Sequence, residues 1–323
     1  MGIMGAGETQ IWEMPMRAMQ VIEANGKLTL KAAEMPAPKP GKGEVLVRIH
    51  AAGVTPTELL WYPTTHTTAG GPRALAVPGH EFSGIVEEVG EGVSQFAAGD
   101  AVYGMNDWFA DGATAEFCIA NAGSIAAKPA RLTHEEAATV PIGALTAWQG
   151  LFTRAKVQPG ESVLVQGGSG AVGLFAVQLA QLHGAKVIAT ASAENASLVK
   201  QLGAEIVIDY KTGRFEDEAR DVDVVFDTVG GETLERSWGV LKPGGRVVTI
   251  AADAEGQQEQ RVKDAFFIVE PHQEQLIEVA SLLDAGTLKT FVKAAVPLDE
   301  APAAYAGQLH SPRAVGKVVV SIL

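Results

Sequence analysis

A glycine-rich stretch, SVLVQGGSGAVGLFAVQLA (residues 162–180), constrains the fold of this chain most strongly. It joins a short apolar run to a helical pattern through G-x-G-x-x-G spacing at Gly168, Gly170 and Gly173. Between a strand and a helix, the first two glycines allow a tight turn close to a pyrophosphate, and the third allows the helix to pack against the strand. Because glycine turns also occur for structural reasons, the neighbouring segments decide what the motif means.

The segments around the motif alternate between strand-like and helix-like patterns. In chain order they are SVLVQ, AVGLFAVQLAQLHG, KVIATA, NASLVKQLG, EIVIDY, DVVFDTVG, ETLERSWGVL and RVVTIA. Apolar strands separated by helices predict a doubly wound parallel sheet, which makes the motif a dinucleotide site. A further helix is predicted over residues 133–155, with Thr133 as its N-cap and Glu136 at the capping-box position.

The first 130 residues have a different texture. RAMQVIEANGKLTLKAAEMP alternates around an Asn25-Gly26 turn and predicts a hairpin. Short β-rich runs bounded by Gly, Pro or Asp follow it and predict a compact, mostly antiparallel β domain. The closing run GKVVVSIL is strand-like and could complete either domain. Residues 1–15 have no clear period and resemble a leader or a cloning remnant.

Composition excludes several classes of partner. The chain has 38 Asp and Glu against 25 Lys and Arg, so its net charge of -13 repels a nucleic-acid backbone and an anionic bilayer. It contains no apolar run long enough for a membrane span and no signal-peptide pattern, which favours a cytoplasmic enzyme. Its one cysteine, Cys118, permits no internal disulfide and is expected to fill a core strand.

The end of the second parallel strand bears on the choice of cofactor. An NAD site usually has Asp or Glu there, about 20 residues after the first glycine, to bind the ribose 2′-hydroxyl. This chain has IATASAEN, with Ser192 at the tip, and Tyr210 and Lys211 follow the third strand. No carboxylate at the tip opposes a 2′-phosphate, although Glu194 lies close in sequence. The pattern favours NADP(H) over NAD(H).

The ordered motifs GEVLVRIHAAGV, PGHEFSGIVEEVG, GDAVYG, PIGALTAWQGLF, VLVQGGSGAVG and GKVVV resemble the medium-chain dehydrogenase/reductase superfamily, and most of all its zinc-independent quinone oxidoreductase branch. The resemblance implies a GroES-like catalytic domain at residues 16–140 and 285–323 and a Rossmann NADP-binding domain at residues 141–284. It also implies an active site in the cleft between them and a homodimer.

A zinc signature requires separate consideration. Residues matching that of zinc-containing alcohol dehydrogenases are Gly79, His80, Glu81, Gly84, Gly90 and Val93. A catalytic zinc needs three protein ligands, and the resemblance places Thr55 and Ile142 where zinc members have cysteine. We therefore predict no metal, and expect His80 and Glu81 to hydrogen-bond to each other or to loop backbone. An unusual site of His80, Glu81 and His66 is the alternative.

Without a Lewis acid, hydride transfer suits an acceptor that needs little polarisation, namely a quinone or an α,β-unsaturated carbonyl. The catalytic candidates are Thr55, Tyr62, His80 and Thr146. Thr55 opens TPTE, where the quinone oxidoreductases often have N-P-V-D, Tyr62 could donate a proton, and Thr146 matches a threonine beside the nicotinamide.

The cofactor-binding candidates are the loop residues Gly168, Ser169, Gly170, Ala171, Val172 and Gly173, then Ser192, Tyr210 and Lys211, and finally Thr146, Phe267, Val269 and Lys317. The resemblance places Thr146, Phe267, Val269 and Lys317 beside the cofactor. The alternatives are that Phe267 and Val269 only pack in the core and that Lys317 is a solvent-exposed charge. Two other functions stay open: a zinc-dependent alcohol dehydrogenase, and a non-catalytic NADPH-binding structural or sensor protein.

Overall fold

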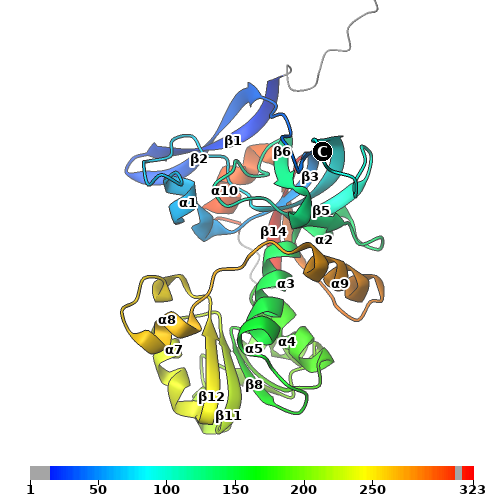
Figure 1. Ribbon diagram of the computed structural model, residues 1–323. Coiled ribbons are helices and arrows are strands. Elements are labelled where there is room, and N and C mark those ends of the chain that lie inside the picture. The colour runs from blue at the N-terminus through cyan, green and yellow to red at the C-terminus, as the bar shows by residue number, and fades with distance from the viewer. Residues whose placement is uncertain (1–14, 310–314) are drawn as a thin grey trace, which may run out of the picture.

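The computed structural model describes residues 15–309 and 315–323, which form two sheet-based layers with helices between them (Figure 1). The leader predicted at residues 1–15 therefore lies, apart from Pro15, outside the described residues. Strands β1 (Pro15–Ala24) and β2 (Lys27–Pro36) form the predicted hairpin. Asn25 and Gly26 both have positive φ, +52° and +71°, as a two-residue type I′ turn requires.

A seven-stranded sheet dominates the first layer. Its order is β13-β14-β3-β4-β5-β7, and β6 also pairs with β3. The strands are β3 (Glu44–Gly53), β4 (Glu81–Val89), β5 (Ala101–Met105), β6 (Phe117–Asn121), β7 (Ile125–Ala127), β13 (Val292–Pro297) and β14 (Lys317–Ser321). All pairs are antiparallel except β13 with β14. The closing strand, β14, pairs with β3 and so completes this sheet.

The second layer is a five-stranded parallel sheet in the order β10-β9-β8-β11-β12. Its strands are β8 (Ser162–Gln166), β9 (Lys186–Ala191), β10 (Ile206–Asp209), β11 (Val222–Asp227) and β12 (Leu241–Thr249). Val163 and Val165 of β8 join one buried cluster, whereas Leu164 joins another, so both faces of the sheet are covered. This is the predicted doubly wound Rossmann arrangement, beside the predicted GroES-like β layer.

Helices α4 (Gly173–Leu182) and α5 (Ala193–Gln201) flank the parallel sheet on one side, and α7 (Gly231–Ser237) and α8 (Gln260–Ala265) on the other (Figure 1). Shorter segments are η2 (Pro56–Leu60), α1 (Tyr62–Thr65), η3 (Ala122–Ser124), α6 (Phe215–Glu218), η5 (Trp238–Val240), η6 (Ala252–Ala254), η7 (Leu298–Glu300) and α10 (Ala301–Tyr305). None of the described helices is long and apolar enough to cross a membrane.

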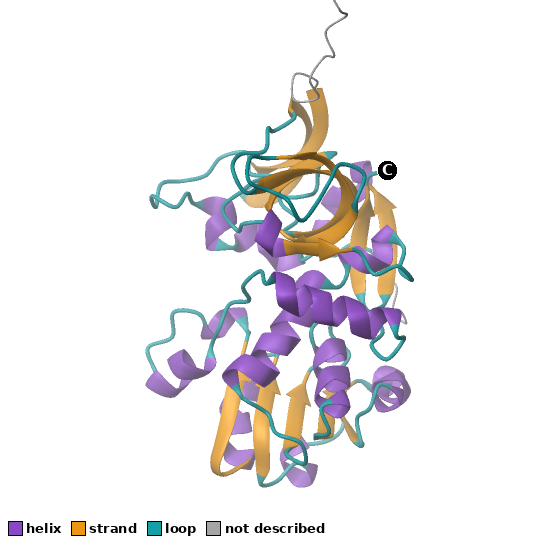
Figure 2. Cartoon of the chain, turned by 45° about the vertical axis from the view of Figure 1, so that its right-hand side comes forward, coloured by secondary structure: helices purple, strands orange, loops and turns teal. Residues whose placement is uncertain are grey.

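The segment predicted as one helix over residues 133–155 is divided into α2 (His134–Ala138), α3 (Pro141–Trp148) and the π-helical turn η4 (Gln149–Arg154), with Pro141 at the start of α3. Helices lie at the junction between the two layers (Figure 2), and Figure 1 shows α2, α3 and α9 (Gln273–Asp284) there. The capping box predicted at Thr133 and Glu136 is present at the start of α2. The Tyr103 hydroxyl of β5 donates to the carbonyl of Leu276 in α9 at 2.6 Å. This buried hydrogen bond ties the antiparallel sheet to the junction helices.

Two glutamines hold the segments that leave and re-enter the parallel-sheet layer. Gln149 donates to the carbonyl of Glu270 and accepts from its amide, at 2.7 and 3.0 Å. Gln178 makes the same pair of bonds with Lys289, at 3.0 and 2.8 Å. A primary amide can bond to both the N–H and the C=O group of one residue. Each glutamine side chain therefore holds a connecting segment that is not part of a sheet.

Candidate active site

The glycine-rich loop lies between the carboxyl end of β8 and the start of α4. An added Cβ on Gly173 would lie 2.1 Å from the Gly167 carbonyl oxygen, and one on Gly168 would lie 2.9 Å from Ala189 of β9. Only glycine therefore permits this close contact of helix, loop and strand, as the motif predicts. The left-handed residue of the turn is Gly167, at φ +79°, which precedes the motif.

The loop has the features of a phosphate cradle. Gly170 is exposed, and an added Cβ there would meet only the Gly167 carbonyl, at 3.3 Å. The amides of Ala171 and Val172, at the start of α4, have no acceptor in the described part of the chain. Ser169 is partly exposed beside them. Free amides and the positive end of a ten-residue helix bind anions, so these residues fit the pyrophosphate of a dinucleotide.

The carboxyl end of β9 lies next to this loop, because the Gly168 amide donates to the Thr190 carbonyl at 2.8 Å. Ser192 follows as the N-cap residue of α5, with no side-chain capping bond and little exposure. Tyr210 is 60% exposed. Lys211 lies 3.6 Å from the Glu194 carboxylate, and both side chains are mostly exposed. Glu194 thus pairs with Lys211, which the sequence predicts to contact the cofactor.

His80 lies deeply buried in the first layer, with Glu58 as its polar partner. The Glu58 Oε1 atom is 2.5 Å from His80 Nδ1 and accepts from the Gly79 amide at 2.6 Å. A carboxylate only accepts, so His80 donates its Nδ1–H. His80 Nε2 is buried and has no partner among the described residues, which is unfavourable unless a bound group completes the site. His80 and Glu81 do not hydrogen-bond to each other, and of the two side chains only Glu81 bonds to backbone, at the Ile142 amide.

Glu81 instead joins three parts of the chain. One of its carboxylate oxygens contacts the Lys317 ammonium group of β14, and the other accepts from the Ile142 amide at the start of α3, at 3.0 Å. Both charged side chains are buried, so the alternative that Lys317 is a solvent-exposed charge is wrong. Burial lowers the pKa of Lys317 to about 7, and the negative charge of Glu58 opposes this shift.

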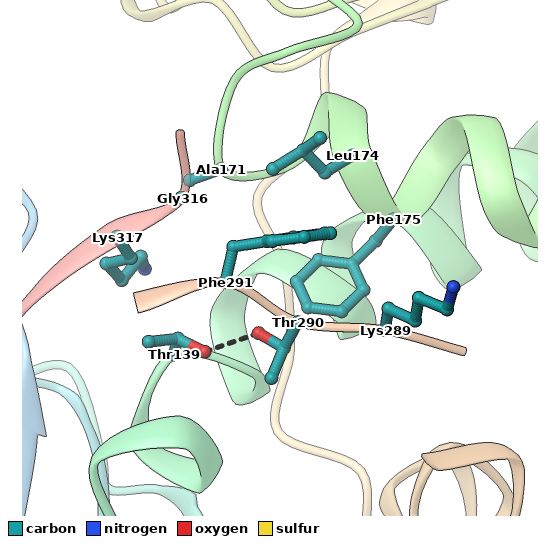
Figure 3. A pocket seen from close by; sticks show the side chains of 9 residues that line it. All are labelled: Thr139, Ala171, Leu174, Phe175, Lys289, Thr290, Phe291, Gly316 and Lys317. Carbon is teal, nitrogen blue, oxygen red and sulfur yellow. Dashed lines mark hydrogen bonds between the residues drawn. The ribbon is translucent and has the colours of Figure 1, made fainter. Parts of the chain in front are cut away.

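A small pocket is lined both by Lys317 and by the glycine-rich loop (Figure 3). Its lining residues come from the loop and α4, the junction and the segments around β13 and β14: Thr139, Ala171, Leu174, Phe175, Lys289, Thr290, Phe291, Gly316 and Lys317. The hydroxyls of Thr139 and Thr290 are 2.5 Å apart across it. Lys317 and Ala171 therefore border one pocket at the layer junction, although Lys317 is far from the loop in sequence.

The other site residues suggested by the sequence occupy different surroundings. Thr146 is buried in α3 and donates to the Ile142 carbonyl at 2.6 Å. Phe267 and Val269 are buried in the same cluster as α3 and α4. Tyr62 is 52% exposed and stacks on His66, with ring centres 4.4 Å apart. Thr55 is partly exposed just before η2 and makes no side-chain capping bond.

Glu58 and Trp108 contact His80 and are not among the site residues predicted from the sequence. Glu58 ends the TPTE run, where the related N-P-V-D run also has an acidic residue, so a signal for it exists. Trp108 follows β5 and has no such signal. Its ring lies 5.2 Å from the His80 ring and 5.3 Å from the Trp61 ring.

The donor set around His80 does not fit zinc. Within residues 15–309 and 315–323, no group of three His, Cys, Asp or Glu side chains could hold a metal ion. This result includes the alternative set of His80, Glu81 and His66. Ile142 offers only its amide, to Glu81, and Cys118 is buried in β6, where burial raises the pKa of its thiol far above the usual value.

Known proteins share both layers of this chain. The model of the alcohol dehydrogenase GroES-like domain matches residues 41–149, and one described as zinc-binding dehydrogenase matches residues 202–320. An Arthroderma benhamiae protein named "Probable zinc-binding oxidoreductase, mitochondrial" is 35% identical, over 92% of this chain and 93% of its own. The chain belongs to the medium-chain dehydrogenase/reductase superfamily.

Within the medium-chain dehydrogenase/reductase superfamily the chain is quinone oxidoreductase-like, as its motifs predict. Rat quinone oxidoreductase is 32% identical, over 94% of this chain and 97% of its own. The structure of the Coxiella burnetii quinone oxidoreductase has a TM-score of 0.84 at 30% identity, over 96% of this chain and 100% of its own. The chain is thus an oxidoreductase of this superfamily, and these relatives point to a nicotinamide cofactor.

Proposed function

We propose that this protein transfers hydride from NADPH to a quinone or an α,β-unsaturated carbonyl without a metal. The observation that carries the proposal is the donor set around His80. Glu58 is the one hydrogen-bond partner of the His80 side chain among the described residues, while Thr55 and Ile142 stand where the resemblance places the cysteines of zinc enzymes. Without a Lewis acid, conjugated acceptors are favoured because hydride addition to them gives a delocalised anion that hydrogen bonds can stabilise.

The cofactor, when bound, supplies the hydride, and the residues of this chain position and select it. The amides of Ala171 and Val172 would bind the pyrophosphate, and Lys317 would lie beside the loop. Ser192, Tyr210 and Lys211 would contact a 2′-phosphate, since the tip of β9 carries no carboxylate. The salt bridge with Glu194 opposes this role, and it is solvent-exposed and hence weak.

His80, Thr55 and Tyr62 are the proposed sources of a proton or hydrogen bond for the reduced acceptor. With its Nδ1–H donated to Glu58, His80 has a free Nε2 atom, which can donate to the acceptor when the ring carries both protons. Thr146 would lie beside the nicotinamide, with Phe267 and Val269 packing behind it. Exclusion of water by these apolar side chains would strengthen each hydrogen bond at the reacting atoms.

The test is a comparison of acceptors. NADPH oxidation should be rapid with 1,4-benzoquinone and a cyclic enone and slow with a simple ketone. Faster turnover of the ketone, or a stoichiometric amount of zinc in the purified protein, would support the zinc alcohol dehydrogenase alternative. Tight NADPH binding without turnover of any acceptor would support the sensor alternative.

We also propose a cytoplasmic homodimer formed through the β12 side of the parallel sheet, acting on a small molecule and binding neither nucleic acid nor membrane. β12 is the outermost of the five parallel strands, and a single bridge from Thr249 to Phe266 follows it. Light scattering after size-exclusion chromatography tests the dimer; a monomer at micromolar concentration would refute it.

A further inference from the structure

Trp108 occupies a loop that is fixed by its own hydrogen bonds. The fully buried Asn106 donates its backbone amide to the His80 carbonyl at 3.3 Å and its side-chain amide to the Asp111 carbonyl at 2.8 Å. The Asp107 carboxylate accepts from the Phe109 amide at 2.8 Å. Hydrogen bonds of Asn106 and Asp107 therefore fix the loop around Trp108, and they do not depend on the Trp108 side chain.

The Trp108 ring meets three segments that are distant in sequence. It is tilted by 39° against the His80 ring and stands nearly edge-on, at 78°, to the Trp61 ring. Its Nε1–H donates to the Val269 carbonyl at 3.4 Å, 161 residues away. The indole thus joins the layer that contains His80 to the segment proposed to flank the nicotinamide.

The ring is also available to a ligand. Trp108 and Trp61 are only partly buried, whereas His80 behind them is 1% exposed. Leu60 and Tyr62, on either side of Trp61, are 74% and 52% exposed. A partly exposed indole ring beside a buried, unpaired ring nitrogen suits a flat apolar group with one polar end.

We propose that Trp108 is a specificity-determining residue, whose indole face positions a planar conjugated acceptor between His80 and the Val269 segment. This inference rests on the proposed function. An offset aromatic contact adds to the hydrophobic effect for a flat ring, and a small acyclic enone gains little from it. The hydrogen bond to Val269 is long, at 3.4 Å, so selectivity should depend on the aromatic face more than on the Nε1 donor.

The experiment compares W108L and W108F with wild type, using 1,4-naphthoquinone and but-3-en-2-one as acceptors. The W108L variant should raise the KM for naphthoquinone about tenfold relative to the KM for the enone. W108F retains an aromatic face without the Nε1 donor and should recover most of the affinity. W238F is the matched control, because Trp238 lies under Arg261 beside the opposite face of the parallel sheet.

Equal losses on both acceptors would show a structural role and overturn the proposal, as would unchanged constants in W108L. Equilibrium dialysis of naphthoquinone in the presence of NADP⁺ separates this proposal from the proposed function, since no hydride is available. A tenfold weaker binding by W108L than by wild type would support the role of Trp108 even if no acceptor is turned over. Equal binding would refute it. Cys118 is buried and so protected from reaction with the quinone.

Discussion

Two glycines of the glycine-rich loop, Gly170 and Gly173, should respond differently to substitution by alanine. An alanine Cβ at Gly173 would lie 2.1 Å from the backbone oxygen of Gly167, whereas real Cβ atoms essentially never come closer than 3.0 Å. The loop and α4 must then separate by about 0.9 Å. At Gly170 the nearest atom, the Gly167 carbonyl oxygen, would be 3.3 Å away, so a small shift accommodates the methyl group, which would occupy the surface proposed to bind the pyrophosphate.

The magnitudes follow from this geometry. Overpacking of this kind costs about 1–3 kcal/mol, so G173A should lower the melting temperature of the cofactor-free protein by about 5 °C and also weaken NADPH binding. G170A should unfold like wild type and bind NADPH at least about tenfold more weakly, because the backbone can no longer approach the phosphates. G239A, where a Cβ meets nothing within 4 Å, is the control and should change neither property.

Differential scanning fluorimetry without cofactor and calorimetric titration with NADPH measure the two properties separately, since bound ligand would itself raise the melting temperature. Wild-type melting of G173A would refute the packing argument. Wild-type NADPH affinity in G170A would show that this loop does not hold the pyrophosphate.

Three further results are expected. E58Q removes the charged acceptor that orients His80 and should lower kcat/KM for quinone reduction at least about tenfold, since such a bond contributes about 1.5–3 kcal/mol; unchanged kinetics would contradict the orienting role. K211A should raise KM for NADPH about tenfold and leave KM for NADH unchanged; equal effects on both would argue against a 2′-phosphate contact. Burial and the stacked His50 lower the pKa of His134 to about 4, so between pH 6.5 and 4 the unfolded chain binds a proton that the folded chain does not. Stability should therefore fall as the pH drops through this window, and urea unfolding of H134Q should show a flatter dependence; an equally steep one would refute the assignment.

Local signals account for most of the fold that the sequence predicts. The Asn25-Gly26 turn, the capping box at Thr133 and the β8–glycine–α4 unit each depend on neighbouring residues, and all three are confirmed. The local pattern of GKVVVSIL suits either sheet and did not determine the partner of the closing strand, and only the family resemblance implied the GroES-like domain. β14 pairs with β3, more than 250 residues earlier.

The site was less predictable for the same physical reason. Glu58, Trp108 and Lys317 acquire their roles from contacts between loops and strands that are far apart in sequence. Lys317 was expected either beside the cofactor or in solvent, and its burial against Glu81 follows from the pairing of β14 with β3. No residue-by-residue pattern encodes that contact.

Most residues of the zinc signature have a structural task that does not depend on a metal. Gly79 has φ +97° and donates to Glu58, and an added Cβ there would lie 2.6 Å from the Thr114 hydroxyl. The later glycines of the signature are equally constrained: Cβ atoms at Gly84 and Gly90 would meet the backbone oxygens of Arg48 and Gly41 at 2.2 and 1.8 Å.

The two charged residues of the signature also stabilise the fold. His80 is paired with a buried carboxylate, and Glu81 joins β4 to both Lys317 and the start of α3. Removing one member of such a buried pair typically costs about 3–5 kcal/mol, so substitutions here are unfavourable whether or not a metal binds. Thr55 is partly exposed and makes no side-chain capping bond, and the Ile142 side chain packs in an apolar cluster, so neither position has a buried charged contact of this kind.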